Sequence, residues 1–166
     1  MCAAGREENF EVDQDKAKKD AAQLYNAGER YWGTNEAEIQ RILAIRSYTQ
    51  LQATFEEYNK ISKLGIDGAI ESETSGDLKD GYLAIVKCVR NRAAFFAERI
   101  NHAIKGLGTN NDMLIRCIVS RCEVDTVKIK EEYEKAYGTS LVDAVKGDTS
   151  GHYKHVLVAL LGERSS

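Results

Sequence analysis

The chain has 166 residues, 43% of them apolar, so it is long enough to form one ordinary domain or two small ones with a sizeable core. With 23 Lys and Arg against 26 Asp and Glu, the formal net charge is -3, which argues against a protein that grips nucleic-acid phosphates. No stretch is apolar for long enough to span a bilayer, and the charged segment 1–20 is unlike a secretion signal. The four cysteines lack the spacing of metal pairs or disulfide scaffolds, which is typical of reduced thiols in a cytosolic protein.

The absence of proline and the abundance of Ala, Glu, Lys, Leu and Ile favour helices interrupted only by glycine. Apolar residues recur with helical spacing, and no run alternates as a strand would. The clearest runs in chain order are Ile39, Ile42 and Leu43, then Leu51, Phe55 and Tyr58, then Tyr82, Leu83, Val86 and Val89. We therefore expect an all-α protein built from helices of roughly 8 to 15 residues.

Side chains that can cap a helix precede the apolar runs. A capping oxygen with a polar residue three positions later satisfies free backbone amides, so each such pair predicts a helix start. The pairs are Asn35 with Glu38, Ser47 with Gln50, Thr109 with Asp112, and Ser140 with Asp143.

Shifting the chain by 75 positions lays one half on the other. Residues 33–35 and 108–110 both read Gly-Thr-Asn, residues 74–76 and 149–151 both read Thr-Ser-Gly, and Arg46 falls on Arg121. The first helices match at a shift of 76, so the first copy has one extra loop residue. We expect five helices per copy, with a leader at 1–15, one repeat at 16–90 and a second at 91–166.

Each copy combines a Gly-rich turn with a distant acid. The acids, Glu73 and Asp148, each precede Thr-Ser-Gly, at what we expect to be the start of the last helix, and each lies 40 residues after the glycine of its turn, Gly33 or Gly108. Outward carbonyls facing a carboxylate form an oxygen cage that suits a hard cation, and we expect this cation to be Ca²⁺. Calcium takes about 6–8 oxygens, which leaves a position that a lipid phosphate can fill.

Taken together, these segments resemble the annexin family over nearly the whole chain. The resemblance rests on residues 105–109 (Lys-Gly-Leu-Gly-Thr), 27–34, 73–76 and 146–151, and on the ending Leu160-Leu161-Gly162. The loop that carries Trp32 is similar to the third annexin repeat, the loop at 105–109 to the fourth, and residues 2–20 to the end of the second repeat and its linker. Annexins ordinarily carry four repeats and two are present here, so the chain is a natural or constructed C-terminal half or a processed fragment.

The resemblance implies that each repeat is a right-handed superhelix of five helices with an annexin-type calcium site. The implied ligands are the carbonyls of Gly28, Tyr31 and Gly33 with the Glu73 carboxylate in the first repeat, and the carbonyls of Ile104, Gly106 and Gly108 with the Asp148 carboxylate in the second. A minor site would use Thr34 and Glu36. Because aspartate is one methylene shorter than glutamate, we expect the second site to hold its ion less tightly.

The implied partner is an acidic phospholipid surface, with the protein cytoplasmic and peripheral at the membrane when calcium is present. Trp32, Arg30, Lys105 and Leu107 are the expected membrane contacts, since an indole favours the bilayer interface. The alternative for Trp32 is packing under its loop, and for Lys105 and Arg30 a solvated surface position. Two bound Ca²⁺ ions would change the net charge from -3 to +1, which favours an anionic surface.

The sequence also bears on two other function classes. Catalysis is disfavoured, because the histidines His102, His152 and His155 show no catalytic spacing and the cysteines lie in apolar stripes, so we expect no enzyme. The alternative function is a calcium-independent helical interaction scaffold, or a homodimer formed through faces that the absent repeats would cover.

Overall fold

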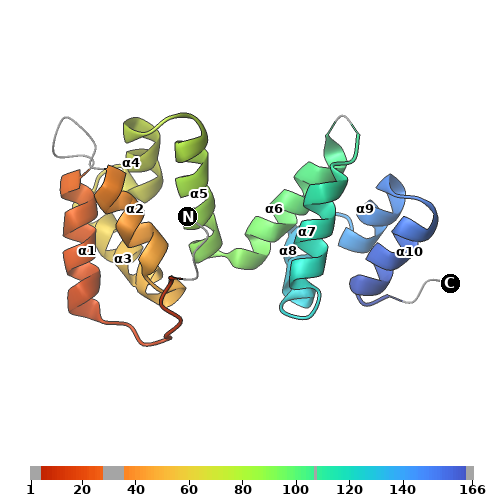
Figure 1. Cartoon of the computed structure of the whole chain (residues 1–166), viewed down its shortest axis with the longest axis horizontal. Coiled ribbons are helices and arrows are strands. Elements are labelled where there is room, and N and C mark those ends of the chain that lie inside the picture. The colour runs from red at the N-terminus through yellow and green to blue at the C-terminus, as the bar shows by residue number, and fades with distance from the viewer. Residues whose placement is uncertain (1–4, 28–35, 107, 164–166) are drawn as a thin grey trace. The chain divides into compact units, whose positions relative to one another are not determined.

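Ten α-helices and no strand make up the described part of the computed structural model, which comprises residues 5–27, 36–106 and 108–163 without the side chain of Glu36 (Figure 1). The helices have 8 to 15 residues, and the all-α prediction is confirmed. The chain divides into two compact units, Met1–Arg90 and Asn91–Ser166. The first unit holds α1 (Gln14–Ala27), α2 (Glu36–Ile45), α3 (Tyr48–Ile61), α4 (Gly65–Glu73) and α5 (Gly76–Arg90). The second holds α6 (Arg92–Lys105), α7 (Asn111–Arg121), α8 (Thr126–Tyr137), α9 (Leu141–Asp148) and α10 (Gly151–Leu160).

The first unit encloses its own apolar core. Helix α1 packs against α2 and α3, and α3 also packs against α4 and α5. Leu51, Tyr58 and Tyr82 are among the fully buried side chains at the centre of this core. These residues belong to the helically spaced runs in the sequence, so the periodicity identified the inward-facing side of each helix.

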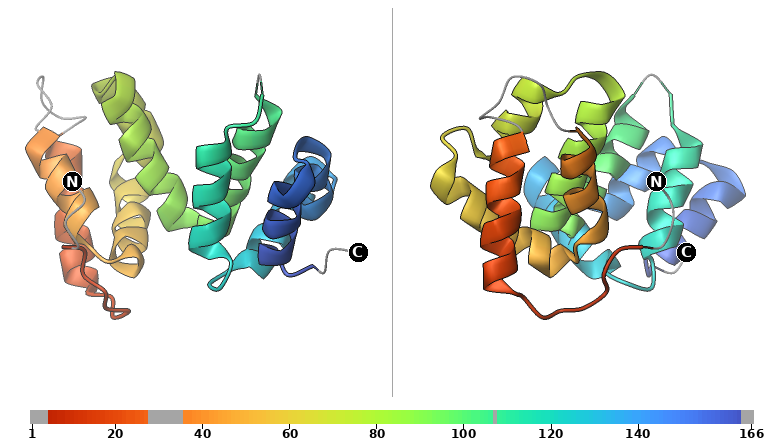
Figure 2. Two further views of the ribbon diagram at one scale, coloured as in Figure 1. Left: turned by 45° about the vertical axis from the view of Figure 1, so that its right-hand side comes forward. Right: turned by 60° about the vertical axis from the view of Figure 1, so that its left-hand side comes forward.

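The second unit repeats this plan. Helix α6 packs against α7, α8 and α9, while α10 packs against α7 and α9. Figure 2 shows α6 and α7 side by side as an antiparallel pair joined by a short loop. The core contains Leu114, Leu157 and Tyr133, and the Tyr133 hydroxyl donates a hydrogen bond to Asn101 Oδ1 at 3.0 Å. This bond satisfies a polar group that burial would otherwise penalise.

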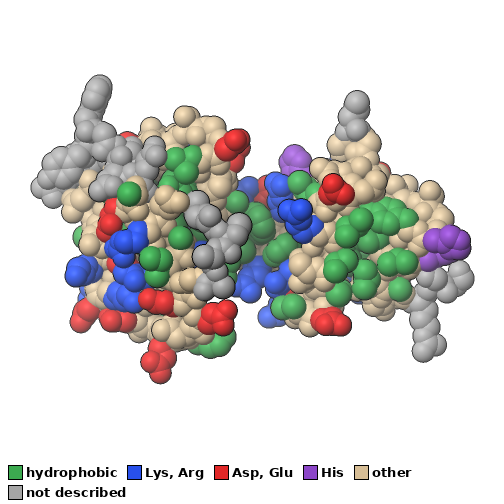
Figure 3. Space-filling model, in the orientation of Figure 1, with side chains coloured by type: hydrophobic (Ala, Val, Ile, Leu, Met, Phe, Trp, Pro, Cys, Tyr) green, Lys and Arg blue, Asp and Glu red, His purple; other side chains and the backbone are tan. Residues whose placement is uncertain are grey.

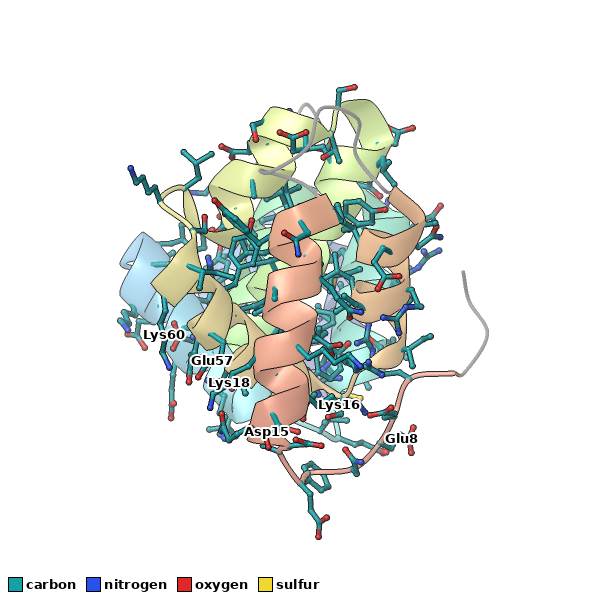
Figure 4. All side chains as sticks on the ribbon, turned by 90° about the vertical axis from the view of Figure 1, so that its left-hand side faces the viewer. Glu8, Asp15, Lys16, Lys18, Glu57 and Lys60 are labelled. Carbon is teal, nitrogen blue, oxygen red and sulfur yellow. The ribbon has the colours of Figure 1, made fainter. Side chains whose placement is uncertain are left out.

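Charged side chains gather at one end of α1 and α3, where Asp15, Lys16, Lys18, Glu57 and Lys60 lie (Figure 4). Lys60 Nζ lies 2.6 Å from Glu57 Oε1 one helical turn away. Because Lys60 is exposed, this pair contributes little to stability. No helix in the described part of the chain is both long and apolar enough to cross a membrane.

Two of the predicted helix caps are confirmed and one is displaced. Ser47 accepts a hydrogen bond from the amide of Gln50, and Ser140 accepts one from the amide of Asp143. The cap of α7 was assigned to Thr109, which is wrong: Asn110 Oδ1 accepts from the Met113 amide at 3.1 Å. The Thr109 hydroxyl instead donates a hydrogen bond to Asp148, which lies 39 residues further along the chain. The predicted cap Asn35 lies outside the described residues.

Candidate functional site

A backbone hydrogen bond joins the two ends of the loop between α6 and α7. The amide of Asn110 donates to the Ala103 carbonyl at 2.8 Å, which ties the start of α7 to the last turn of α6. Gly108 has a φ of +87°, a conformation that side chains with a Cβ rarely adopt. The Gly108 carbonyl oxygen lies close to Gly106, only 3.6 Å from the position that a Cβ would occupy there. The loop is therefore a tight, exposed turn whose peptide groups lie near one another.

Thr109 connects this turn to the acid that the repeat pattern paired with it. Its hydroxyl Oγ1 lies 2.7 Å from Asp148 Oδ2 and donates a hydrogen bond to that carboxylate; the Asp148 carbonyl oxygen is 3.3 Å away. Asp148 is the last residue of α9 and is exposed. Residues 39 positions apart in sequence thus meet at one point on the surface, as the constant spacing predicted.

The charges around the contact of Thr109 with Asp148 favour the binding of a cation. Helices α6 and α9 both end here, and the last carbonyls of a helix lack helical partners and carry partial negative charge. The Asp148 carboxylate adds a full negative charge at the C-terminus of α9, where the helix dipole disfavours it. A cation held between the turn and Asp148 would relieve this unfavourable interaction.

Tyr153 on α10 lies close to the same carboxylate. Burial raises the pKa of its phenol, and the nearby Asp112 and Asp148 carboxylates raise it further. Its hydroxyl is buried and has no hydrogen-bond partner among the described residues. Neither the position of Tyr153 nor the Thr109 hydrogen bond was predicted from the sequence, because the repeat pattern pairs the turn with the acid without showing which side chains meet.

In the first unit the described part of the corresponding site is Glu73. It is the half-buried last residue of α4, and with Leu24 of α1 and Ile39 of α2 it lines a small pocket. The acid therefore lies beside the two helices that flank the first Gly-rich loop. The segment after Glu73 has the same local structure as the segment after Asp148. Thr74 Oγ1 donates a hydrogen bond to the Ile70 carbonyl, and Thr149 Oγ1 donates one to the Val145 carbonyl, both at 2.6 Å.

One expectation about both acids is wrong. The sequence placed them at the start of the last helix of each repeat, but Glu73 ends α4 and Asp148 ends α9. The following threonine is the C-cap, and the next helix begins at Gly76 or Gly151 with a positive φ. The acids therefore lie at the negative rather than the positive end of a helix dipole.

Several predicted site residues lie outside the described part of the structure. These are Gly28, Arg30, Tyr31, Trp32, Gly33, Thr34 and Leu107, together with the side chain of Glu36. Of the others, Gly106 and Gly108 are exposed, the Ile104 side chain is buried, and the Lys105 ammonium lies 5.9 Å from the centre of the Tyr137 ring. Within the described residues, no three His, Cys, Asp or Glu side chains form a group that could hold a metal, so a cation here would depend on backbone oxygens.

Comparison with known sequences agrees with the resemblance to annexins. A model of the annexin family matches this chain twice, over residues 19–85 and 95–160. The chain is 46% identical over 162 residues to annexin A4 of Canis lupus familiaris, covering 98% of this chain and 51% of that protein. It is 49% identical over 158 residues to annexin A3 of Mus musculus, covering 95% and 49% of the two chains. The chain thus spans about half the length of the curated relatives it matches.

Solved structures agree with the sequence comparison. A structure of annexin III superposes with a TM-score of 0.92 at 47% identity and covers 97% of this chain and 50% of that chain. A calcium-bound annexin (Sm)1 superposes with a TM-score of 0.82 at 37% identity and covers 93% of this chain and 42% of that one. These matches show the annexin-repeat fold.

Proposed function

Because the chain belongs to the annexin family, we propose that it binds acidic phospholipid surfaces in a calcium-dependent manner. The observation that carries this proposal is the hydrogen bond of 2.7 Å that joins Thr109 of the α6–α7 turn to the carboxylate of Asp148. A calcium-bound relative with the same fold supports the choice of ion.

In the second unit, the calcium ligands are the carbonyls of Ile104, Gly106 and Gly108 and the carboxylate of Asp148. All four residues lie at the joined ends of α6 and α9. Three carbonyls and a bidentate carboxylate supply about five oxygens, whereas calcium takes about 6–8. A phosphate oxygen of a lipid headgroup completes the shell, so lipid and calcium each strengthen binding of the other.

In the first unit, the proposed ligands are the carbonyls of Gly28, Tyr31 and Gly33 and the carboxylate of Glu73, with Thr34 and Glu36 as a minor site. Support comes from the sequence repeat and from the position of Glu73 beside α1 and α2. The proposed membrane contacts are Trp32, Arg30, Lys105 and Leu107. The protein acts at the cytoplasmic face of a membrane as a peripheral binder, with no catalytic role.

The decisive experiment is co-sedimentation with phosphatidylserine vesicles in calcium or in chelator. The wild-type chain should pellet only with calcium, and the variant that combines Glu73→Gln with Asp148→Asn should stay in the supernatant while keeping its helical circular dichroism. A charge-matched control combines Glu71→Gln with Asp80→Asn, since both acids are exposed and lie outside the proposed sites. Pelleting that persists in chelator, or full binding by the first variant, would refute the proposal.

The competing function is a calcium-independent interaction scaffold, and one observation favours self-association. Large apolar side chains of the second unit are exposed on α7 and α10. These side chains are not among the proposed calcium ligands, so self-association and calcium binding could occur in the same molecule.

A further inference from the structure

A buried tyrosine hydroxyl adjoins the candidate site of the second unit and has no hydrogen-bond partner among the described residues. It belongs to Tyr153 in the first turn of α10, whose side chain packs against the core of this unit. Buried polar atoms in folded proteins are nearly always paired, so an exception of this kind calls for an explanation.

Two carboxylates lie near this hydroxyl, on two different helices. Asp148 ends α9, and the chain then enters α10 at Gly151 with a φ of +60°, so that α10 packs against both α9 and α7. Asp112 lies exposed in the first turn of α7, and Figure 3 shows acidic side chains at the surface of the second unit beside the α6–α7 loop. Burial raises the pKa of the Tyr153 phenol, and the nearby Asp112 and Asp148 carboxylates raise it further. The phenol therefore keeps its proton at neutral pH and is available as a hydrogen-bond donor to a carboxylate.

The Asp148 carboxylate is able to accept one more hydrogen bond. Its Oδ2 accepts from Thr109 at 2.7 Å, while its Oδ1 has no partner among the described residues. A carboxylate has about four acceptor positions, and an ion bound through both oxygens uses two of them. Thr109 uses a third, which leaves one for a second hydroxyl.

The first unit has a different residue at this position. At the shift of 75 positions, Tyr153 corresponds to Leu78, and Asp148 corresponds to the longer acid Glu73. Leu78 packs against the core of its unit, so an apolar side chain meets the packing needs of this place in the repeat. The hydroxyl of Tyr153 is therefore not required for packing, and it occurs in the unit whose acid has the shorter reach.

We propose that Tyr153 is a positioning residue of the second calcium site, whose hydroxyl donates a hydrogen bond to the Asp148 carboxylate as the ion binds. This inference rests on the proposed calcium function. Tyr153 and Asp148 are not hydrogen-bonded in the structure, so the bond is gained only when the exposed carboxylate turns toward its ligand position. Thr109 and Tyr153 then hold one carboxylate from two sides, and a metal ligand supported in this way binds more tightly.

Calorimetric calcium titration in a Glu73→Gln background, which isolates the second site, tests the proposal. Tyr153→Phe keeps the ring and removes only the hydroxyl, so calcium affinity should fall about tenfold. In chelator, the same variant should melt no lower than its parent, because the deleted hydroxyl makes no hydrogen bond in the structure. The matched control is Tyr133→Phe, which deletes a hydroxyl that is bonded to Asn101 at 3.0 Å. This control should melt at a lower temperature and keep its calcium affinity.

Asp112→Asn distinguishes the two nearby carboxylates. When it is added, Tyr153→Phe should still lower calcium affinity about tenfold, because the acceptor is Asp148. Loss of that effect would assign the hydroxyl to Asp112 and overturn the proposal. Unchanged affinity in Tyr153→Phe, an equal loss in Tyr133→Phe, or a lower melting temperature of Tyr153→Phe in chelator would overturn it as well. A Glu73→Gln parent that binds no calcium would refute the calcium function of the second unit itself, and this inference with it.

Discussion

Thr109 is the residue that holds the candidate calcium ligand in place. Its hydroxyl fixes Asp148 at the α6–α7 turn, although the hydroxyl is not itself one of the proposed ligands. Replacing Thr109 by Val removes the donor with little change in shape, so Asp148 gains freedom that calcium binding must remove. We expect calcium affinity at this site to fall about tenfold, in line with the loss of a supporting hydrogen bond.

Thr109→Ser is the matched control for this effect, because it keeps the hydroxyl and should bind calcium nearly as well as the wild type. Calorimetric titration of both variants in a Glu73→Gln background isolates the second site. Equal affinities for the valine and serine variants would show that the hydroxyl plays no part in positioning Asp148.

Arg46 and Arg121 occupy matched positions but use different partners. Arg46 Nε lies 2.6 Å from Asp20 Oδ2, and this charged hydrogen bond raises the pKa of the guanidinium. In the second unit, the residue that corresponds to Asp20 is Phe96, and Arg121 stacks over its ring at 5.0 Å while pairing with Asp125. The arginine is thus structural in both units.

Asp20→Ala should therefore destabilise the first unit strongly, because it leaves a mostly buried guanidinium without its main partner. We expect a loss of about 3 kcal/mol in the free energy of unfolding. Glu57→Ala, which breaks the pair of exposed Lys60, should cost less than about 1 kcal/mol. Urea denaturation of both variants measures the difference, and equal losses would mean that the Arg46 contact is no stronger than a surface pair.

At the scale of helices, the sequence predicted most of what the structure shows. Apolar spacing identified the buried sides, and Ser47 and Ser140 marked helix starts, because these signals are local. The start of α7 was misplaced by one residue because Thr109 is engaged by Asp148 from another helix, which no local pattern reveals.

Two glycines test the role of backbone conformation, one at the end of a helix and one inside a helix. Gly138 caps α8 in the left-handed conformation with a φ of +69°, so Gly138→Ala should destabilise by about 1 kcal/mol. Gly81 lies inside α5, and a methyl group there would meet nothing within 4 Å, so Gly81→Ala should stabilise by about 0.5–1 kcal/mol. Thermal melts compare the two, and shifts of the same sign would contradict this assignment of the two glycines.

At the scale of the whole molecule, the repeat is the feature that made the candidate site predictable. The spacing common to both copies paired Asp148 with the turn whose glycine lies 40 residues earlier, a long-range contact that one copy alone would not have suggested. The apolar side chains exposed on α7 and α10 were not identified in the sequence, because the fold decides which side of an amphipathic helix stays uncovered. Each unit therefore carries its own candidate calcium site.

The most direct test of the central claim is a crystal structure of the chain grown with calcium. The account predicts an ion between the α6–α7 turn and α9, with the carbonyl oxygens of Ile104, Gly106 and Gly108 and the Asp148 carboxylate at about 2.3–2.6 Å. Density for an ion elsewhere, or a calcium-saturated crystal in which Asp148 contacts only Thr109, would contradict it.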